Sequence, residues 1–266
     1  MATMRPLSQL AASRPLDLLF FDIDDTFTHE GQVTAQGFAA LERWQAAGRH
    51  AVAVTGRPAG WCDHLARMWP VDAVIGENGA FWFAYRRADK RLERVWLAQP
   101  EPGPALQARL QQAAQAVLAK HPQARLASDQ PYRLFDVAID FAEDIDPPLS
   151  LQEAQDIATL LRDLGLTAKV SSIHVNAWLG EQDKYSACVR WLNEAMGLEE
   201  AQAHQRSVYV GDSPNDEPMF ARFPFSVGVA NVRPFLPAMR TPPAFITDQA
   251  ASAGFCELID HLLAHC

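Results

Sequence analysis

The first part of the chain alternates short apolar runs with segments whose apolar residues recur at helical spacing. Residues 16–23 (LDLLFFDI), 50–55 and 71–75 are nearly continuous apolar runs, which is the pattern of strands buried on both faces of a parallel sheet. Residues 34–47 and 59–69 lie between these runs and place apolar side chains on one helical face. This βαβαβ order predicts a parallel α/β sheet covered by helices.

From residue 81 the pattern changes to that of an α+β module. We expect a hairpin, two helices and two further strand segments, at residues 81–87 with 92–98, 104–120, 151–164, 134–141 and 166–178. In residues 134–141, Asp136 and Asp140 alternate with apolar side chains. The alternation predicts a sheet with one apolar face under helices and one polar face free to meet something else.

The parallel pattern returns at residue 184. We expect helices at the two ends of this part and three strands between them, at residues 184–196, 207–210, 225–229, 244–247 and 253–264. The chain is therefore predicted to be of the α/β class, with a doubly wound, Rossmann-like core formed by residues 1–80 and 183–266. Residues 81–182 form an inserted α+β domain of ordinary domain size.

Composition narrows the classes of partner. The 266 residues carry 23 Lys and Arg against 32 Asp and Glu, a net charge of −9, which repels phosphate backbones and anionic lipid. We therefore expect no nucleic acid partner and no membrane partner. The four cysteines, at positions 62, 188, 256 and 266, form no C-x-x-C pair, and the first twenty residues lack a secretory signal pattern. These features favour a cytoplasmic protein. We expect it to be a monomer or a homodimer.

Polar residues follow the ends of the predicted core strands. They lie in residues 22–26 (DIDDT), 55–58 (TGRP) and 211–216 (GDSPND), and Lys184 opens the helix after the inserted domain. Ligands of open parallel sheets bind beyond the carboxyl ends of the strands. The topology therefore predicts that these four segments meet at one edge of the sheet.

Three of the five aspartates in these segments would repel each other if they lay together. Asp22, Asp24 and Asp212 would need a hard cation among them, and Mg²⁺ is the expected ion because it takes oxygen ligands and keeps positions for water and a substrate phosphate. The predicted cluster therefore indicates a metal-dependent reaction of a phosphate compound.

Neutral and cationic groups at the same edge can bind phosphate oxygens. They are the Thr55 hydroxyl, the backbone amides around Gly56 and the Lys184 ammonium. Only four of the 23 basic residues are lysines, and a cation is disfavoured at a helix start, so a nearby anion is a better explanation for Lys184 than solvation.

These four motifs resemble, in the usual order, those of the haloacid dehalogenase-like phosphatases. The insertion and residues 75–80 (IGENGA) resemble the subgroup with an αβ cap between motifs two and three. That subgroup includes Cof-type sugar phosphatases, sucrose-phosphate phosphatase, mannosyl-3-phosphoglycerate phosphatase and phosphomannomutase. The resemblance covers residues 16–80 and 183–248, and Asp25 departs from it because the family usually has glycine there.

The resemblance implies roles for the catalytic residues. Asp22 would attack phosphorus and form an aspartyl-phosphate, and Asp24 would protonate the leaving alcohol and then deprotonate the water that hydrolyses the intermediate. Thr55 and Lys184 would stabilise the transferring phosphoryl group.

The resemblance also implies the ligands of the metal and of the phosphate. Mg²⁺ would be held by Asp22, the Asp24 backbone carbonyl and Asp212, with Asp216 or Asn215 supporting it directly or through water. The implied phosphate-binding positions beside Thr55 and Lys184 are Gly56, Arg57 and Asn215.

Two residues of the predicted cap are candidates for substrate recognition. His174 and Asn176 alternate with apolar residues, so they share the polar face of the last cap strand. The alternative is that this face is simply solvated.

The expected function is that of a Mg²⁺-dependent phosphomonoesterase acting on a small phosphorylated metabolite, a sugar phosphate or a mannosyl-3-phosphoglycerate-type substrate. One alternative is phosphomannomutase-like phosphoryl transfer, which would need paired arginines facing the site. The other is a non-catalytic sugar-phosphate sensor, which the presence of both Asp22 and Asp24 argues against.

Overall fold

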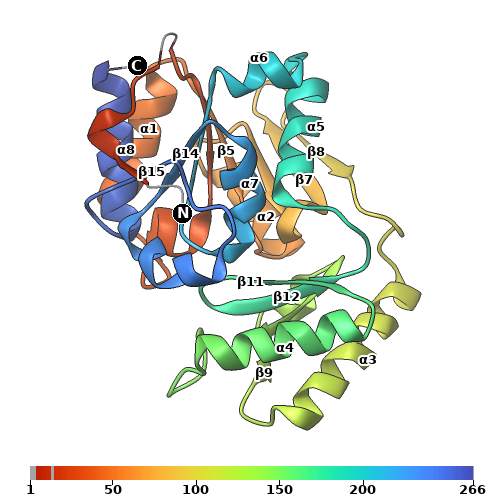
Figure 1. Cartoon of the computed structure of the whole chain (residues 1–266). Helices are drawn as coiled ribbons and strands as arrows, with labels where there is room; N and C mark the ends of the chain where they lie inside the picture. Colours follow the sequence, from red (N-terminus) through yellow and green to blue (C-terminus); the bar gives the residue numbers. More distant parts are fainter. Residues whose placement is uncertain (1–3, 13–14, 266) are drawn as a thin grey trace.

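The computed structural model describes residues 4–12 and 15–265, and its larger part is a sheet covered by helices on both faces (Figure 1). The sheet has nine strands in the order β1-β15-β14-β13-β2-β5-β6-β7-β8. The strands are Arg5–Pro6 (β1), Leu18–Phe21 (β2), His50–Val54 (β5), Ala73–Gly76 (β6), Phe81–Arg86 (β7), Arg91–Trp96 (β8), Ser207–Gly211 (β13), Phe225–Gly228 (β14) and Phe245–Ile246 (β15). In this spatial order, all neighbouring strands from β1 through β2 to β6 are parallel, which confirms the predicted fold class.

Two apolar layers sandwich this sheet because its strands are apolar on both faces. The strand β2 alternates Leu19 and Phe21 on one side with Leu18 and Phe20 on the other, all buried. The first layer contains α1 (Ala35–Ala46), α2 (Ala59–Met68) and α8 (Ala251–His265). The second contains α5 (Lys184–Met196), α6 (Glu200–His204) and α7 (Glu217–Arg222).

The inserted domain is a second sheet with helices on one face only. Its strand order is β11-β12-β10-β9, with β9 at Arg125–Leu126, β10 at Asp136–Asp140, β11 at Thr167–Val170 and β12 at His174–Trp178. The helices α3 (Pro104–Lys120) and α4 (Leu151–Asp163) cover the side away from the core, so the other face of the sheet is turned toward the core (Figure 1). This arrangement follows from the apolar and polar alternation of β10.

Two expectations about the inserted domain are wrong. Residues 166–178 form two antiparallel strands, β11 and β12, joined by a turn in which Ser171 N–H donates to His174 O at 2.8 Å. Both strands alternate with the same period, so the pattern could not locate the turn between them. The hairpin β7–β8, assigned above to residues 81–182, instead extends the core sheet, because β7 pairs with β6. We therefore place the start of the cap after Trp96.

Several short elements carry no hydrophobic period and were not predicted. They include the small hairpin of β3 (Thr28–His29) and β4 (Gln32–Val33), as well as the 3-10 turn at Pro214–Asp216. Cys62, Cys188 and Cys256 are free thiols, while Cys266 lies outside the described residues. Within residues 4–12 and 15–265, no helix is long and apolar enough to cross a membrane.

The start of α5 is fixed by a turn from the first half of the core. Asp183 caps the helix by accepting from Ser186 N–H at 2.7 Å, and Lys184 is the first helical residue. Gly79 packs directly on this cap with a φ of +105°, and a Cβ atom at Gly79 would lie 2.2 Å from the Asp183 carbonyl oxygen. The position of Lys184 therefore depends on the absence of a side chain at residue 79.

We predict that Gly79→Ala destabilises the fold by at least about 2 kcal/mol, because the new methyl group clashes with backbone as well as requiring a left-handed conformation. Gly48→Ala is the matched control, since Gly48 also has positive φ but nothing lies within 4 Å of a Cβ atom there. The control is expected to cost about 1 kcal/mol. Chemical denaturation of both variants measures the difference, and equal losses would contradict the role of the Gly79 contact.

Candidate active site

The first motif places Asp22 between two neighbouring motifs at the edge of the sheet. The strand β2 pairs with β5 on one side and β13 on the other, with Phe21 opposite Ala53 and Val210. Asp22 follows directly, donates its N–H to Val210 O at 2.9 Å and is 5% exposed. The prediction that the motifs meet at the carboxyl ends of the strands is confirmed for these three segments.

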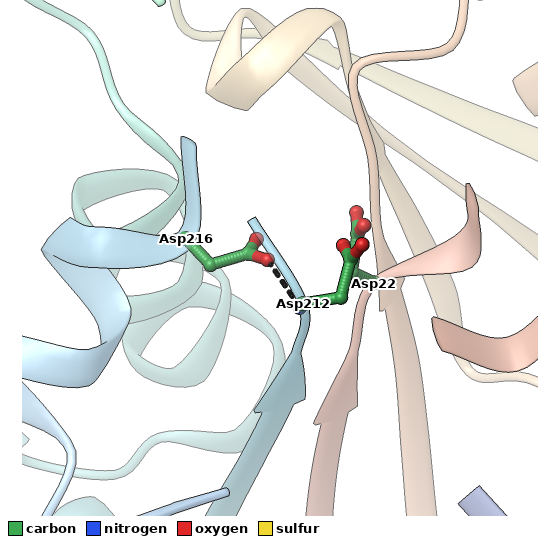
Figure 2. Close-up of side chains that lie close together, drawn as sticks. All are labelled: Asp22, Asp212 and Asp216. Atoms are coloured by element: carbon green, nitrogen blue, oxygen red, sulfur yellow. Dashed lines mark hydrogen bonds between the residues drawn. The ribbon is translucent and has the colours of Figure 1, made fainter. Parts of the chain in front are cut away.

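Three buried carboxylates come together at this edge (Figure 2). Oxygen atoms of Asp22, Asp212 and Asp216 lie within 4.8 Å of one another. Burial raises the pKa of Asp22 to about 8, against the opposing effect of Lys184. Burial and the charges of Asp22 and Asp216 also raise the pKa of Asp212 well above its usual range. A divalent cation with a preference for oxygen ligands fits this set, because it would offset both effects.

Asp216 has its oxygens already engaged by the protein. One accepts hydrogen bonds from Lys184 Nζ at 2.6 Å and from the Tyr209 hydroxyl, and the other accepts from the backbone amides of Asp212 at 2.9 Å and Ser213 at 3.2 Å. The carboxylate therefore holds the fourth motif in a closed turn. Tyr209, an inward residue of β13, has no polar sequence pattern around it that would have identified this role.

Lys184 joins two of the three carboxylates. Its Nζ lies 2.6 Å from Asp22 Oδ1 and 2.6 Å from Asp216 Oδ1, and the side chain is 1% exposed. Burial alone would lower the pKa of Lys184, but the adjacent Asp216 and Asp22 carboxylates raise it above its ordinary value. The ammonium is therefore charged and directed at the end of β2, where the sequence argument expected an anion.

The second motif contributes the hydroxyl group of Thr55 and, at Gly56, a backbone segment without a side chain. Thr55 is fully buried, and its Oγ1 accepts from Arg57 N–H at 3.0 Å. A Cβ atom at Gly56 would lie 3.2 Å from Asn78 Nδ2 and 3.4 Å from Asn176 Oδ1, so amides from core and cap converge on this glycine. Asn215 belongs to the same group, because its Nδ2 donates to Asn78 Oδ1 at 3.3 Å.

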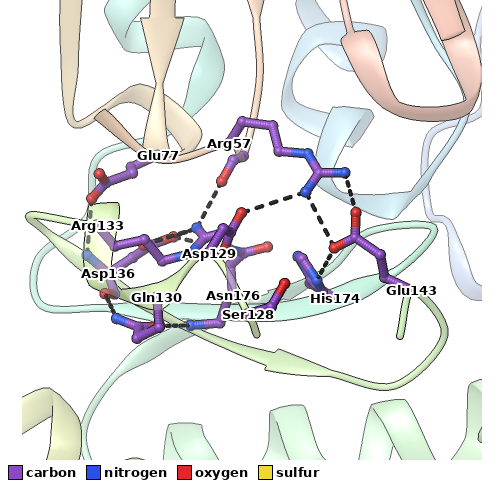
Figure 3. Close-up of polar contacts among 12 residues, drawn as sticks. Arg57, Glu77, Ser128, Asp129, Gln130, Arg133, Asp136, Glu143, His174 and Asn176 are labelled. Atoms are coloured by element: carbon purple, nitrogen blue, oxygen red, sulfur yellow. Dashed lines mark hydrogen bonds and ion pairs between the residues drawn. The ribbon is translucent and has the colours of Figure 1, made fainter. Parts of the chain in front are cut away.

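Arg57, predicted to bind phosphate, forms ion pairs with three carboxylates, of which Asp129 and Glu143 are labelled in Figure 3. Its guanidinium donates to both oxygens of Asp24 at 2.8–3.0 Å, to both oxygens of Glu143 at 2.5 and 3.2 Å, and to Asp129 at 3.4 Å. The ring of Trp61 lies 4.5 Å from the guanidinium carbon. Through Arg57, the second motif thus contacts Asp24, which the resemblance implies as the proton donor, and two carboxylates of the cap.

The polar face of the cap sheet is turned toward the core and is buried. His174 Nε2 lies 2.9 Å from Glu143 Oε2, and Asn176 Nδ2 donates to Asp136 Oδ2 at 2.9 Å. Although burial acts to raise the pKa of Glu143, His174 and Arg57 lower it to about 2. The alternative that this face is solvated is wrong. Glu143 was missed because it lies in a loop without a recognisable motif.

A buried glutamate fastens the cap to the core. The Glu77 carboxylate accepts hydrogen bonds from the amides of Ala59 at 2.9 Å, Leu134 at 3.0 Å, Phe135 at 2.6 Å and Asp136 at 3.2 Å. These amides belong to α2 on the core side and to the beginning of β10 on the cap side. Glu77 lies within the IGENGA segment, so the signal was present, but its contact across domains depends on the tertiary fold.

Arg133 makes a second connection from the cap. Its Nη1 donates to Gly56 O at 2.8 Å and to Asp136, and its other nitrogens contact Asp129 at 2.9 and 3.0 Å (Figure 3). The side chain is fully buried, so its charge is neutralised within the cap. The connection sets the cap directly over the second motif.

A cavity of about 300 Å³ lies between the two domains beside Asp24. Its walls come from core and cap residues, namely Asp24, Asp25, Glu30, Gly31, Arg57, Ala142, Glu143 and Ile173.

Comparison with known proteins finds a family match in the first part of the chain. Residues 19–94 match the haloacid dehalogenase-like hydrolase family. A phosphoglycolate phosphatase of Methanothrix thermoacetophila is 28% identical over 138 residues, which cover 51% of this chain and 54% of the relative. The matched segment thus spans about half the length of that curated relative.

Solved structures share the whole fold at low identity. Protein 0175 of Thermoplasma acidophilum has a TM-score of 0.68 at 17% identity, covering 94% of this chain and 99% of that one. The sucrose-phosphatase of Synechocystis sp. PCC6803, solved with sucrose and phosphate, has a TM-score of 0.61 at 18% identity, covering 94% and 98%. The likeness extends through the cap and confirms the resemblance to the capped subgroup at the level of fold.

We predict that Glu77→Gln loosens the cap. The amide keeps the shape of the side chain but replaces one acceptor oxygen by a donor, which leaves buried N–H groups of residues 134–136 without partners. The free energy of unfolding is expected to fall by about 2–4 kcal/mol, and amide hydrogen exchange in residues 134–136 should accelerate. Glu93→Gln, at an exposed position of β8, is the control. Unchanged exchange in Glu77→Gln would contradict this role.

Proposed function

We propose that this chain, whose residues 19–94 match the haloacid dehalogenase-like hydrolase family, is a Mg²⁺-dependent phosphomonoesterase for small phosphorylated metabolites, in particular sugar phosphates. The observation that carries the proposal is the contact of Lys184 Nζ with Asp22 Oδ1 at 2.6 Å beside the buried Asp212 carboxylate. This proximity at the carboxyl edge of the sheet supports the roles proposed for them, with Asp22 as nucleophile, Lys184 as phosphate-binding cation and Asp212 as metal ligand.

The residues around Asp22 fit a magnesium ion. Asp22, Asp212 and the backbone carbonyl of Asp24 would hold it, and Asp216 would support them by fixing Lys184 and the amides of the fourth motif. The bound ion supplies positive charge that offsets the repulsion between a carboxylate nucleophile and a phosphate ester. The raised pKa values of Asp22 and Asp212 support this assignment, because they express how poorly the protein alone compensates these carboxylates.

Asp22 is the proposed nucleophile. Lys184 engages its Oδ1, which leaves Oδ2 outside that ion pair for attack on phosphorus. As the bond from Asp22 to phosphorus forms, the bond from phosphorus to the ester oxygen breaks, giving an aspartyl-phosphate and an alcohol. Lys184, the Thr55 hydroxyl and the Gly56 amide would bind the three phosphoryl oxygens that do not react.

Asp24 is the proposed acid and base. In the first step it gives a proton to the departing ester oxygen, and in the second it removes a proton from the water that attacks the aspartyl-phosphate. That attack breaks the bond from Asp22 to phosphorus and releases inorganic phosphate. Arg57 donates to both Asp24 oxygens, which orients this side chain for both steps, and the proton that Asp24 takes from water replaces the one that it gave to the ester oxygen.

The cap supplies the surface that meets the rest of the substrate. His174 and Asn176, proposed for recognition, approach the site through Glu143 and Gly56 respectively. Closure of the cap would exclude water while the phosphoryl group is transferred. The named activities of the similar proteins, phosphoglycolate phosphatase and sucrose-phosphatase, support a phosphomonoester of a small metabolite.

Hydrolysis is favoured over the two alternatives by specific contacts. A phosphomannomutase-like cap would direct paired arginines at a second phosphate, whereas the interface arginine of this cap, Arg133, is neutralised by Asp129 and Asp136. A sensor would not require a second carboxylate beside the nucleophile, yet Asp24 is held by two-point contacts with Arg57.

Asp22→Asn is expected to lower phosphate release by at least about a thousandfold, since the amide is a poor nucleophile at phosphorus. The measurement is kcat/KM with Mg²⁺ on a panel of sugar phosphates and on p-nitrophenyl phosphate. Asp163→Asn, an exposed residue at the end of α4, serves as the matched control and should retain parental activity. Full activity of Asp22→Asn would exclude the aspartyl-phosphate route.

Mg²⁺ is expected to raise the unfolding temperature. At a concentration of a hundred times its Kd, it should increase the free energy of unfolding by about 2.7 kcal/mol. Without metal, Asp212→Asn should be more stable than the parent, because it removes a buried and repelled carboxylate, and it should lose the response to Mg²⁺. Asp163→Asn should keep the response, and chelation should stop phosphate release. A parental response to Mg²⁺ in Asp212→Asn would exclude this residue as a ligand.

A further inference from the structure

The cavity between core and cap adjoins the proposed proton donor. Asp24 forms part of its wall, together with Asp25 and Arg57 from the core and Glu143 from the cap. Under the proposed function, the ester oxygen of the substrate leaves toward Asp24. The cavity is therefore where the alcohol part of the substrate has to lie.

The charge of this cavity is unusual for a site that receives an anionic ester. Besides Asp24, which has to carry its proton when the ester binds, the lining residues include the acids Asp25, Glu30 and Glu143, and among the described lining residues the one cation is Arg57. That guanidinium is already shared between Asp24 and Glu143, and beyond the wall it also reaches Asp129. A carboxylate on the substrate would thus meet an excess of negative charge with no unpaired cation to receive it.

Asp25 adds to this charge at a position where the backbone favours glycine. Its φ is +54°, in the left-handed region, and the residue lines the cavity beside Asp24. Asn231 Nδ2 donates to the Asp25 carbonyl at 2.9 Å and to Asp212 Oδ2 at 3.2 Å, which fixes the turn that presents this side chain. The acid is thus held in the wall by a side chain that also contacts the fourth motif.

Carboxylates that cannot take a second anion still accept hydrogen bonds. Each ionised carboxylate is an acceptor only, and hydroxyl groups are the donors that match it without adding charge. The volume, about 300 Å³, is at the small end of ligand sites and suits a monosaccharide or a short polyol.

We propose that this site selects an uncharged, hydroxyl-rich leaving group and rejects one that carries a carboxylate. The proposal rests on the proposed function and narrows its substrate class, because it favours phosphates of neutral sugars and polyols over phosphoglycerate-type esters. Asp25 is the specificity-determining residue of this selection, with Glu30 at the exposed rim contributing less because water screens its charge.

Two pairs of esters that differ in one group test the proposal. Glycerol 3-phosphate differs from 3-phosphoglycerate, and glucitol 6-phosphate from 6-phosphogluconate, by a CH₂OH group in place of a carboxylate. With Mg²⁺ present, kcat/KM should be at least about tenfold higher for the polyol ester of each pair. The ratio should fall as ionic strength increases, because screening weakens the repulsion.

Variants assign the selection to the cavity wall. Asp25→Asn removes one charge, keeps the size of the side chain and tolerates positive φ, so it should lower the ratio several-fold by accelerating the carboxylate ester. Glu30→Gln should lower the ratio less and provides a second test if Asp25→Asn folds poorly. Asp163→Asn, remote from the cavity, should leave the ratio unchanged.

Turnover of p-nitrophenyl phosphate separates the two possible failures. If this ester is hydrolysed but each carboxylate ester has a kcat/KM equal to or above that of its polyol partner, the selection is refuted and the phosphatase stands. A parental ratio in both Asp25→Asn and Glu30→Gln would likewise overturn the assignment to these side chains. If no ester, including p-nitrophenyl phosphate, releases phosphate with Mg²⁺, the proposed function itself fails.

Discussion

The ion pairs of Lys184 with Asp22 and Asp216 are the constraint on which the site depends. Burying a carboxylate or an ammonium alone would cost several kcal/mol, so these charges are retained in the interior only because they compensate one another. The compensation is incomplete, since Asp212 joins the cluster without a cation of its own and the pKa of Asp22 is raised to about 8. Without a bound ion, the burial of these carboxylates at the edge of the sheet is unfavourable. The same burial favours the binding of a cation and, with it, a phosphate.

A second set of buried polar contacts connects the cap to the core. Arg57 reaches from the second motif to Glu143 and Asp129, and Glu77 accepts hydrogen bonds from amides at the beginning of β10. Each contact buries a group that would otherwise lose water without a partner, so separation of the domains has to rehydrate all of them. Cap position, access to Asp24 and the charge of the cavity are therefore linked through one guanidinium.

Much of the fold was predictable because period and strand order are local properties of the sequence. Side-chain spacing alone predicts the apolar core strands with helices between them. It also predicts the helices that start at Lys184 and Pro104 and the polar face of β10. The placement of β7 and β8 was not predictable in this way. A hairpin has the same pattern whether it joins one sheet or another, and the choice depends on which edge strand is left unpaired by the rest of the fold.

The sequence by itself determined the kinds of chemical group present and their order along the chain. Carboxylates, a threonine, a glycine and one scarce lysine follow strand ends, and parallel topology brings such ends together. Only the tertiary structure decided how those groups are paired. Arg57 contacts acids instead of standing free, Asp216 is saturated by donors, and Glu143 and Glu77 acquire roles across the domain boundary. The physical reason is that pairing depends on distance and burial between segments far apart in the chain, and spacing along the sequence carries no information about either.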